Sequence, residues 1–205
     1  MKLGVIIRLR EDTDLEAKFK EAHEMGFESV QLTCWQMDRY TDEVAETIKG
    51  AMEKYNVRIS FWCGWRGKES WMWNSYEGPL TLGIVPPHAR FERILDLKKG
   101  SDFAKKLGVD QIATHAGFIP EDPNDERYRE TIVALREIAA HCKKNGQYFL
   151  FETGQETPFT LARAIEDIGL DNVGVNLDPA NLILYGKANP VDSLYLLGKY
   201  IRDVH

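Results

Sequence analysis

The chain has 205 residues, of which 43% are hydrophobic and 28% charged, and these values are typical of one globular domain. Its 26 lysines and arginines face 32 aspartates and glutamates, and the resulting charge of -6 disfavours nucleic acid as a partner. No apolar stretch approaches the about 20 residues that span a membrane. Arg8 and Arg10 cut the first apolar run, so a signal peptide is not expected. We therefore expect a cytoplasmic protein with no membrane partner.

The chain has three cysteines, Cys34, Cys63 and Cys142. Their odd number, their wide spacing and the lack of a CxxC pattern argue against a disulfide framework or a zinc knuckle. We expect reduced, buried thiols.

A unit made of an amphipathic helix, a glycine and a short β-rich strand repeats along the chain. After an opening strand over residues 3–8, the expected strands cover residues 27–33, 57–62, 109–115, 147–152, 170–178 and 199–205. Each of these six strands follows a residue that tolerates the left-handed conformation closing a helix: Gly26, Asn56, Gly108, Gly146, Gly169 and Gly198. The sequence therefore predicts seven strands separated by six helices.

Capping signals support the helices that precede these strands. Thr13 with Glu16 predicts a capping box at the first helix, and Thr41 precedes the second. Thr157 and Asn189 each stand before a proline at the first helical position. Strict alternation of strand and helix predicts a parallel sheet with right-handed crossovers.

An open doubly wound sheet and a (β/α)₈ barrel both satisfy this alternation. The open sheet is disfavoured because the chain has no G-x-G-x-x-G turn and no P-loop. A TIM barrel averages about 250 residues. We therefore expect an α/β fold of the TIM (β/α)₈ type, in which residues 1–205 form a single domain that is truncated after strand seven. By this interpretation helix seven, strand eight and helix eight are missing.

Ligand-type side chains follow four neighbouring strands. His115 ends the fourth strand, and Glu152, Asp178 and His205 end the next three at equivalent positions. Active sites of such barrels lie at the carboxyl ends of the strands. Two carboxylates and an imidazole meeting there can bind a divalent ion such as Mn²⁺, Zn²⁺, Co²⁺ or Mg²⁺. A single such residue would more simply be a loop cap, but the three together favour a metal site.

The segments "IATHAG", "FLFETGQET", "VGVNLDPANL" and "IRDVH" resemble those of the xylose isomerase-like TIM barrel superfamily, in particular its sugar phosphate isomerase/epimerase branch. The resemblance covers nearly the whole chain. It implies one divalent ion held by Glu, Asp, His and a second Glu from strand eight. Glu152, Asp178 and His205 match the first three ligands, and the fourth has no counterpart in the sequence.

The resemblance implies an isomerase or epimerase that removes a proton next to a carbonyl and passes through an enediolate. Glu152 is then expected to be the catalytic base as well as a metal ligand. His115 is expected either to bind a substrate hydroxyl or to satisfy polar groups of the barrel. Asn181 suits a sugar contact or a helix cap, and Glu156 a substrate contact or a solvated loop charge.

The longest connection covers residues 63–90 and contains several aromatic side chains: Trp65, Trp71, Trp73 and Tyr76. Loops longer than about 12–15 residues are usually functional or disordered, and the aromatic content argues against disorder. The rings suit either stacking on the apolar face of a sugar or a subunit contact. Trp62, at the end of the preceding strand, is the best candidate for a substrate pocket.

Three other functions stay open. A dehydratase of cyclic polyols, resembling inosose dehydratase, would begin with the same proton abstraction. An abasic-site endonuclease-like phosphodiesterase is disfavoured because Asn181 stands where those enzymes have a further histidine, and "VQLTCW" offers none. A binding module without turnover would use the same mouth. We expect a small sugar or sugar phosphate as partner, and a homodimer or homotetramer.

Overall fold

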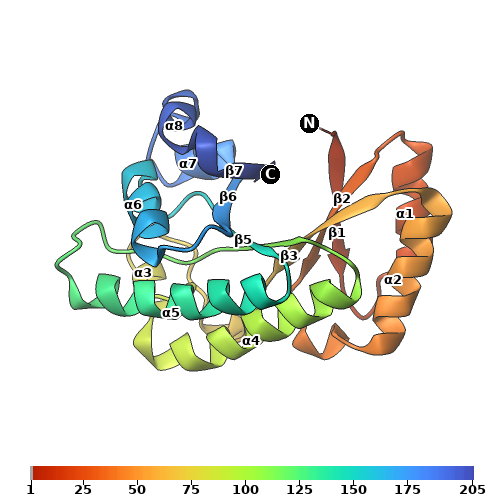
Figure 1. The fold of residues 1–205 in the computed structure, drawn as a ribbon, viewed down its shortest axis with the longest axis horizontal. Helices are drawn as coiled ribbons and strands as arrows, with labels where there is room; N and C mark the ends of the chain where they lie inside the picture. Colours follow the sequence, from red (N-terminus) through yellow and green to blue (C-terminus); the bar gives the residue numbers. More distant parts are fainter. Residues whose placement is uncertain (1) are drawn as a thin grey trace.

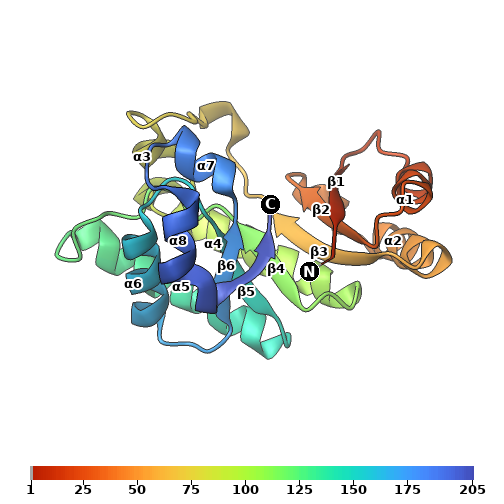
Figure 2. The same cartoon turned by 90° about the horizontal axis from the view of Figure 1, so that it is seen from above.

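Seven parallel strands form one sheet in the computed structural model, which describes residues 2–205 and only the backbone of Glu69. In sheet order the strands are β1 (Gly4–Leu9), β2 (Ser29–Cys34), β3 (Arg58–Cys63), β4 (Gln111–Thr114), β5 (Tyr148–Glu152), β6 (Val173–Leu177) and β7 (Ile201–Val204). The sheet curves with its helices outside, and both chain ends lie near its open side (Figures 1 and 2). The predicted α/β fold of TIM-barrel type with seven parallel strands is confirmed, and the strands form an open half-barrel because β1 and β7 do not pair with each other.

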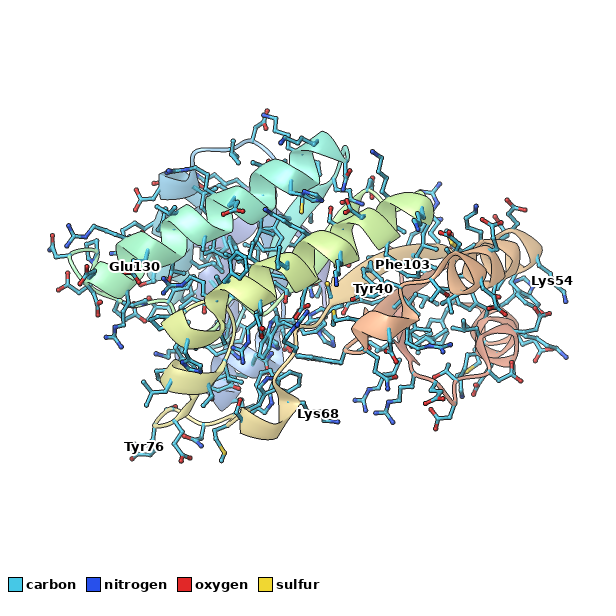
Figure 3. The ribbon with its side chains drawn as sticks, turned by 90° about the horizontal axis from the view of Figure 1, so that it is seen from below. Tyr40, Lys54, Lys68, Tyr76, Phe103 and Glu130 are labelled. Atoms are coloured by element: carbon cyan, nitrogen blue, oxygen red, sulfur yellow. The ribbon has the colours of Figure 1, made fainter. Side chains whose placement is uncertain are left out.

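The helices are α1 (Leu15–Glu24), α2 (Asp42–Tyr55), α3 (Gly78–Thr81), α4 (Pro87–Lys106), α5 (Glu126–Lys144), α6 (Pro158–Ile168), α7 (Pro179–Leu184) and α8 (Pro190–Leu197). Short 3-10 turns are η1 (Met37–Arg39), η2 (Lys68–Ser70) and η3 (Gly198–Tyr200). Figure 3 shows α4 and α5 beside each other on the outer surface. No helix in residues 2–205 has the length and apolarity needed to cross a membrane.

Most helix starts are those that the sequence predicts. The side chains of Thr41, Thr157 and Asn189 each accept a backbone N–H at the start of their helix. The capping box at Thr13 is wrong, because Asp14 is the N-cap of α1. The Thr13 hydroxyl instead donates to the carbonyl of Arg8, which holds the turn after β1.

Left-handed residues close helices at five of the six expected junctions. The φ angles of Gly26, Asn56, Gly108, Gly146 and Gly169 lie between 51° and 82°. Gly198 differs, with φ of -50°, because η3 continues from α8 and leads directly into β7. The position of the junction is as predicted, but its conformation is not.

The core has two parts, one between the sheet and the helices and one inside the barrel. The outer part is apolar and includes fully buried Phe19, Ile48 and Leu135. All three cysteines are free and buried, and burial raises the pKa of Cys34 to about 11 and of Cys142 to about 12. Their thiols therefore stay protonated at neutral pH, as expected for inert groups.

Side chains inside the barrel form layers, because parallel strands in register present equivalent positions at the same height. One layer is a polar cluster in which the side-chain amides of Gln31 and Gln111 both donate to Asp203 of β7. The next layer contains Trp62, Ala113 and Leu150. Glu152, two residues after Leu150 on β5, lies in the following layer, at the carboxyl end of the strand.

Candidate active site

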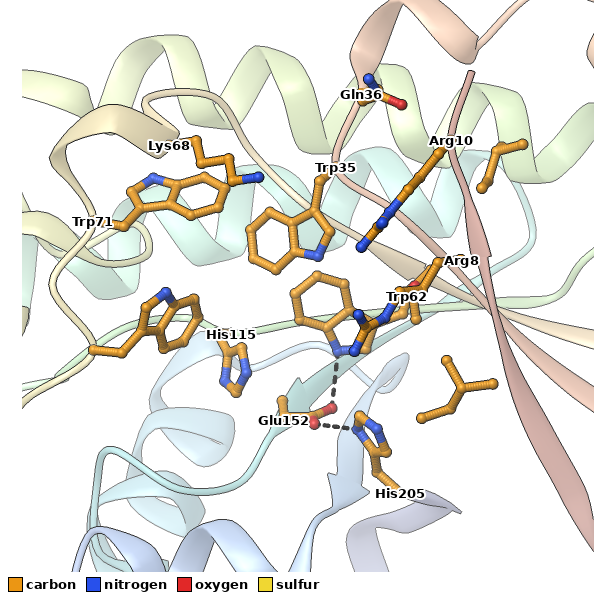
Figure 4. A pocket seen from close by; sticks show the side chains of 14 residues that line it. Arg8, Arg10, Trp35, Gln36, Trp62, Lys68, Trp71, His115, Glu152 and His205 are labelled. Carbon is orange, nitrogen blue, oxygen red and sulfur yellow. Dashed lines mark hydrogen bonds and ion pairs between the residues drawn. The ribbon is translucent and has the colours of Figure 1, made fainter. Parts of the chain in front are cut away.

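A cavity of about 650 Å³ opens at the carboxyl ends of the strands (Figure 4). Four tryptophans, two histidines, three basic side chains and one carboxylate line it, together with smaller groups. The aromatic and charged members are Arg8, Arg10, Trp35, Trp62, Lys68, Trp71, Trp73, His115, Glu152 and His205. The volume is in the usual range for small-molecule sites, about 300–1,000 Å³.

Glu152, Asp178 and His205 meet beside this cavity. Each offers one ligand atom, and these atoms lie within 4.8 Å of one another. Glu152 is 1% exposed and Asp178 9% exposed. The structure thus brings the three residues together from the ends of three neighbouring strands. Two carboxylates and an imidazole at this separation fit a divalent ion of the Mn²⁺, Co²⁺ or Zn²⁺ type.

The Glu152 carboxylate is fixed on both oxygens. Its Oε2 accepts a hydrogen bond from Trp62 Nε1 at 2.9 Å and another from Asn176 Nδ2. Its Oε1 contacts His205 Nδ1. Burial alone would raise the pKa of Glu152, but the hydrogen bond to His205 and the charges of His115 and His205 outweigh it, and the net pKa is lowered. The carboxylate is therefore ionised at neutral pH.

The other two residues of the cluster are held differently. Asp178 is the N-cap of α7, and its Oδ1 accepts the N–H of Asn181 at 2.9 Å. The Thr153 hydroxyl accepts the Asp178 N–H at 2.7 Å and donates to the Asp178 carbonyl at 3.0 Å. The hydrogen bond to Glu152 raises the pKa of His205, against the effect of burial.

His115 lines the cavity next to the cluster. It is 8% exposed, and its Nδ1 lies 3.2 Å from the side-chain oxygen of Gln155. Its ring stands edge-on to Trp62 and Trp73, with centroids 5.4 and 5.1 Å away. Burial lowers the pKa of His115, although the Glu152 charge opposes this. The imidazole of His115 is therefore neutral at pH 7 and can exchange hydrogen bonds with a ligand.

Tryptophans form one wall of the cavity, and Trp35 is at its centre. The Trp35 ring lies 4.7 Å from Trp62 and 4.5 Å from Trp71, between centroids. Trp65 is fully buried behind this wall. The expected loop of residues 63–90 is too long, because α4 already begins at Pro87.

Two of the predicted substrate residues lie outside the lining of the cavity. Asn181 is in the first turn of α7, beside Gly154, and its backbone N–H completes the cap on Asp178. Glu156 is only 2% exposed, so the expectation of a solvated loop charge is wrong. Neither of its carboxyl oxygens has a hydrogen-bond partner among the described residues, and burial raises its pKa to about 8.

Several lining or supporting residues were not predicted from the sequence, among them Arg8, Arg10, Trp35, Lys68 and Asn176. A signal for Arg8 was present, because it alternates with the apolar Ile7 and Leu9 in the first strand and so points to the other face of the sheet. No comparable local signal marks Asn176. Its role depends on the register between β5 and β6, which places it opposite Glu152.

Comparisons with known proteins agree with this architecture. A family model described as "Xylose isomerase-like TIM barrel" matches residues 19–205. The structure of a xylose isomerase domain protein from Planctomyces limnophilus is similar over all of this chain and 72% of that chain, with 29% identity and a TM-score of 0.89. No curated protein sequence matches significantly.

Two further solved structures resemble the whole of this chain at low identity, which shows the fold alone. A D-psicose 3-epimerase from Clostridium cellulolyticum H10, crystallised with D-tagatose, has a TM-score of 0.76 and 14% identity over 72% of its chain. The probable 3-DHS dehydratase AsbF from Bacillus anthracis has a TM-score of 0.74 and 21% identity over 72% of its chain.

Proposed function

The chain belongs to the xylose isomerase-like TIM barrel family, and from this premise we propose that it is a divalent-metal-dependent sugar isomerase or epimerase. The observation that carries the proposal is the convergence of the Glu152, Asp178 and His205 ligand atoms within 4.8 Å at the mouth of the barrel. Solved sugar epimerases share the fold. A cytoplasmic location and a homo-oligomeric state stay predictions.

Glu152, Asp178 and His205 would hold the ion. When bound, a divalent ion polarises a substrate carbonyl and neutralises the negative charge that develops on its oxygen. The polar surroundings of the cluster fit this role, because Trp62 and Asn176 orient Glu152 while Thr153 and the start of α7 orient Asp178. Such outer contacts preserve the ligand positions against side-chain rotation.

Glu152 would act as the general base. Its lowered pKa keeps it ionised near neutral pH, and Trp62 and Asn176 hold one of its oxygens so that the carboxylate has one orientation. A proton leaves the carbon next to the substrate carbonyl and moves to Glu152, which leaves an enediolate. Return of a proton to the adjacent carbon gives an isomer, and return to the other face of the same carbon gives an epimer.

The cavity walls would position the sugar. Neutral His115 can exchange hydrogen bonds with a substrate hydroxyl, and the faces of Trp62 and Trp73 offer apolar surface beside it. Trp71 and Trp73 come from the long connection after β3 and cover this side of the mouth. They would exclude water from the reacting carbons.

Deuterium exchange tests the proposal directly. The chain is incubated with Mn²⁺ and D-fructose or D-tagatose in D₂O, and incorporation next to the carbonyl is followed by NMR. Exchange is expected for the wild type and should fall by about 1,000-fold or more in Glu152→Gln, since that variant lacks the base. Asp171→Asn, an exposed carboxylate on another part of the surface, is the control. Exchange that persists in Glu152→Gln would contradict the assignment.

A dehydratase is the second candidate, because the fold is shared with the probable dehydratase AsbF. The first step would be the same proton abstraction by Glu152, followed by departure of a β-hydroxyl group. Product analysis on ketoses and inososes separates the two functions: retention of all oxygens indicates isomerisation, and loss of water indicates dehydration.

A further inference from the structure

Three basic side chains enter the cavity, and none of them belongs to the proposed metal site. Arg8 and Arg10 extend from the β1 side and Lys68 from η2, with Trp35 between Lys68 and Arg10 in the view of Figure 4. We propose that these three residues form an anion-binding subsite and that the substrate carries a phosphate or carboxylate group. This inference rests on the proposed function, whose substrate class it narrows.

The fold places Arg8 on the inner face of β1 and Arg10 directly after the end of this strand. Ile7 is buried in the outer core, so the next residue, Arg8, faces the other way, and Arg10 lies beside it along the cavity lining. Register confirms this direction, because Arg8 pairs with Thr33 and Thr33 pairs with Trp62, and all three line the cavity. Both arginines line the cavity, and both side chains are exposed to solvent.

The charge balance of the cavity is opposite to that of the whole molecule. The chain carries a formal charge of -6, yet the cavity lining contains three basic side chains and a single carboxylate. That carboxylate is Glu152, which is already engaged by His205, Trp62 and Asn176. A ligand with an anionic group would therefore balance a local excess of positive charge.

The three basic residues also have no acidic partner among the side chains that the structure describes. Among the described side chains, Arg8, Arg10 and Lys68 form no ion pair, whereas Arg66 and Arg127 each bind a carboxylate. Like charges gathered without counter-charges repel one another, and a bound anion relieves this repulsion. A guanidinium presents paired N–H donors that match the oxygens of phosphate or carboxylate.

The arrangement would orient a substrate along the cavity. An anionic group held at Arg8 and Arg10 and a sugar ring against Trp35 and Trp62 would leave the opposite end of the molecule near Glu152. The cavity volume of about 650 Å³ can accommodate a sugar with one such substituent. The subsite would therefore supply orientation as well as affinity.

Binding of inorganic phosphate to the metal-free chain tests the subsite without turnover. Trp35, Trp62 and Trp71 line the same cavity, so titration is followed by tryptophan fluorescence. We expect saturable binding that weakens with added salt and falls by about tenfold or more in the double variant Arg8→Gln/Arg10→Gln. The control is Arg58→Gln, a strand arginine at the amino end of β3 that does not line the cavity.

Paired sugars then identify the anion. The affinities of D-fructose 6-phosphate and D-fructuronate are each compared with that of D-fructose. The anionic sugar that binds more tightly shows whether the subsite prefers a phosphate or a carboxylate. The preference should disappear in Arg8→Gln/Arg10→Gln and persist in Arg58→Gln. Equal binding of charged and neutral probes by the wild type, or phosphate binding that survives the double variant, would overturn the subsite.

The two proposals fail separately. Deuterium exchange with neutral sugars but no arginine-dependent phosphate binding would remove the subsite and leave the enzyme assignment intact. Arginine-dependent phosphate binding without metal binding or exchange would retain the subsite and remove the enzyme assignment.

Discussion

At the scale of single residues, Trp62 links the tryptophan wall to the chemistry, because its indole N–H donates to Glu152 Oε2 at 2.9 Å. This hydrogen bond favours the ionised carboxylate. We expect Trp62→Phe to raise the pKa of Glu152 and shift the acidic limb of the pH–rate profile to higher pH. Metal affinity should also fall by about 10- to 100-fold, as for other outer-shell partners of metal ligands.

The matched control is Trp73→Phe, which changes another ring of the cavity that has no hydrogen bond to Glu152 among the described residues. Its acidic limb should stay in place even if substrate affinity changes. If both variants shift the limb equally, the hydrogen bond from Trp62 does not set the pKa of Glu152.

Glu156 gives a second prediction at this scale. Burial raises its pKa to about 8, compared with 4.5 for the free side chain. Between these two pH values the folded chain holds a proton that the unfolded chain has lost. The free energy of unfolding therefore falls as pH rises through this window, by at most about 1.4 kcal/mol per pH unit. Above the folded pKa this contribution levels off.

Glu156→Gln should remove this dependence, because an amide of the same shape does not ionise. Urea unfolding at pH 5, 7 and 9 measures the effect: the variant should gain stability relative to wild type most at pH 9 and least at pH 5. An equal difference at all three pH values would show that Glu156 does not titrate in this window.

At the scale of elements, the connection between β3 and α4 is fixed by Arg93. Its guanidinium donates to the carbonyls of Thr81 and Gly83, each at 2.8 Å, and lies 4.3 Å from the Trp65 ring centroid. Arg93 is 1% exposed, so the carbonyls of Thr81 and Gly83 cannot form hydrogen bonds to water in its place when the side chain is shortened. This one residue joins both ends of the aromatic connection to α4.

We expect Arg93→Met to lower the free energy of unfolding by about 2–4 kcal/mol, because it removes hydrogen bonds and leaves buried carbonyls unpaired. Cleavage by a protease should increase within residues 64–86. Urea unfolding and limited proteolysis measure the two effects. Arg129→Met, which loses a single exposed carbonyl bond, is the control. Unchanged proteolysis would show that Arg93 does not hold the connection.

Local sequence signals were enough for the elements themselves. Helix caps such as Thr41 and closing residues such as Asn56 act within a few positions, so the order of the strands and of the six longer helices can be predicted without distant contacts. The short helices α3 and α7 were not predicted. The predicted N-cap at Thr13 was wrong because the neighbouring Asp14 is also a good capping residue and caps α1. The Thr13 hydroxyl donates instead to the carbonyl of Arg8, and this contact depends on the turn after β1.

The proximity of Glu152, Asp178 and His205 could be predicted because they occupy equivalent positions at the ends of neighbouring strands. Their role as metal ligands stays a prediction. Residues whose contacts with the site depend on a neighbouring strand or loop were not predicted. Asn176 contacts Glu152 only because the register between β5 and β6 places the two residues opposite each other. Trp35 becomes part of the tryptophan wall only because it packs against Trp71, which comes from the distant connection after β3. The position of Arg8 in the cavity was not predicted, because its charge was interpreted only as the end of an apolar run.

At the scale of the whole molecule, the proposed metal ion would tie together β5, β6 and β7, and β7 is an edge of the sheet. Binding to the folded chain alone stabilises it, by about 2.7 kcal/mol when the free ion is at 100 times its Kd. We expect Mn²⁺ to raise the melting temperature at pH 7.5 and EDTA to reverse the effect. Asp178→Asn and His205→Gln should both lose most of this response.

The stabilisation by metal should also depend on pH in a direction set by His205. Its pKa is raised by Glu152, so the proton competes with the ion up to a higher pH than for a free imidazole. The shift produced by Mn²⁺ should therefore shrink as pH falls through the raised pKa of His205, and it should be full above that pKa. Differential scanning fluorimetry from pH 5 to 8.5, with and without Mn²⁺, measures this. His88→Gln, an exposed histidine on α4, should follow the wild-type curve. A shift of equal size at every pH would mean that the ion does not displace the proton of His205 and is held elsewhere on the chain.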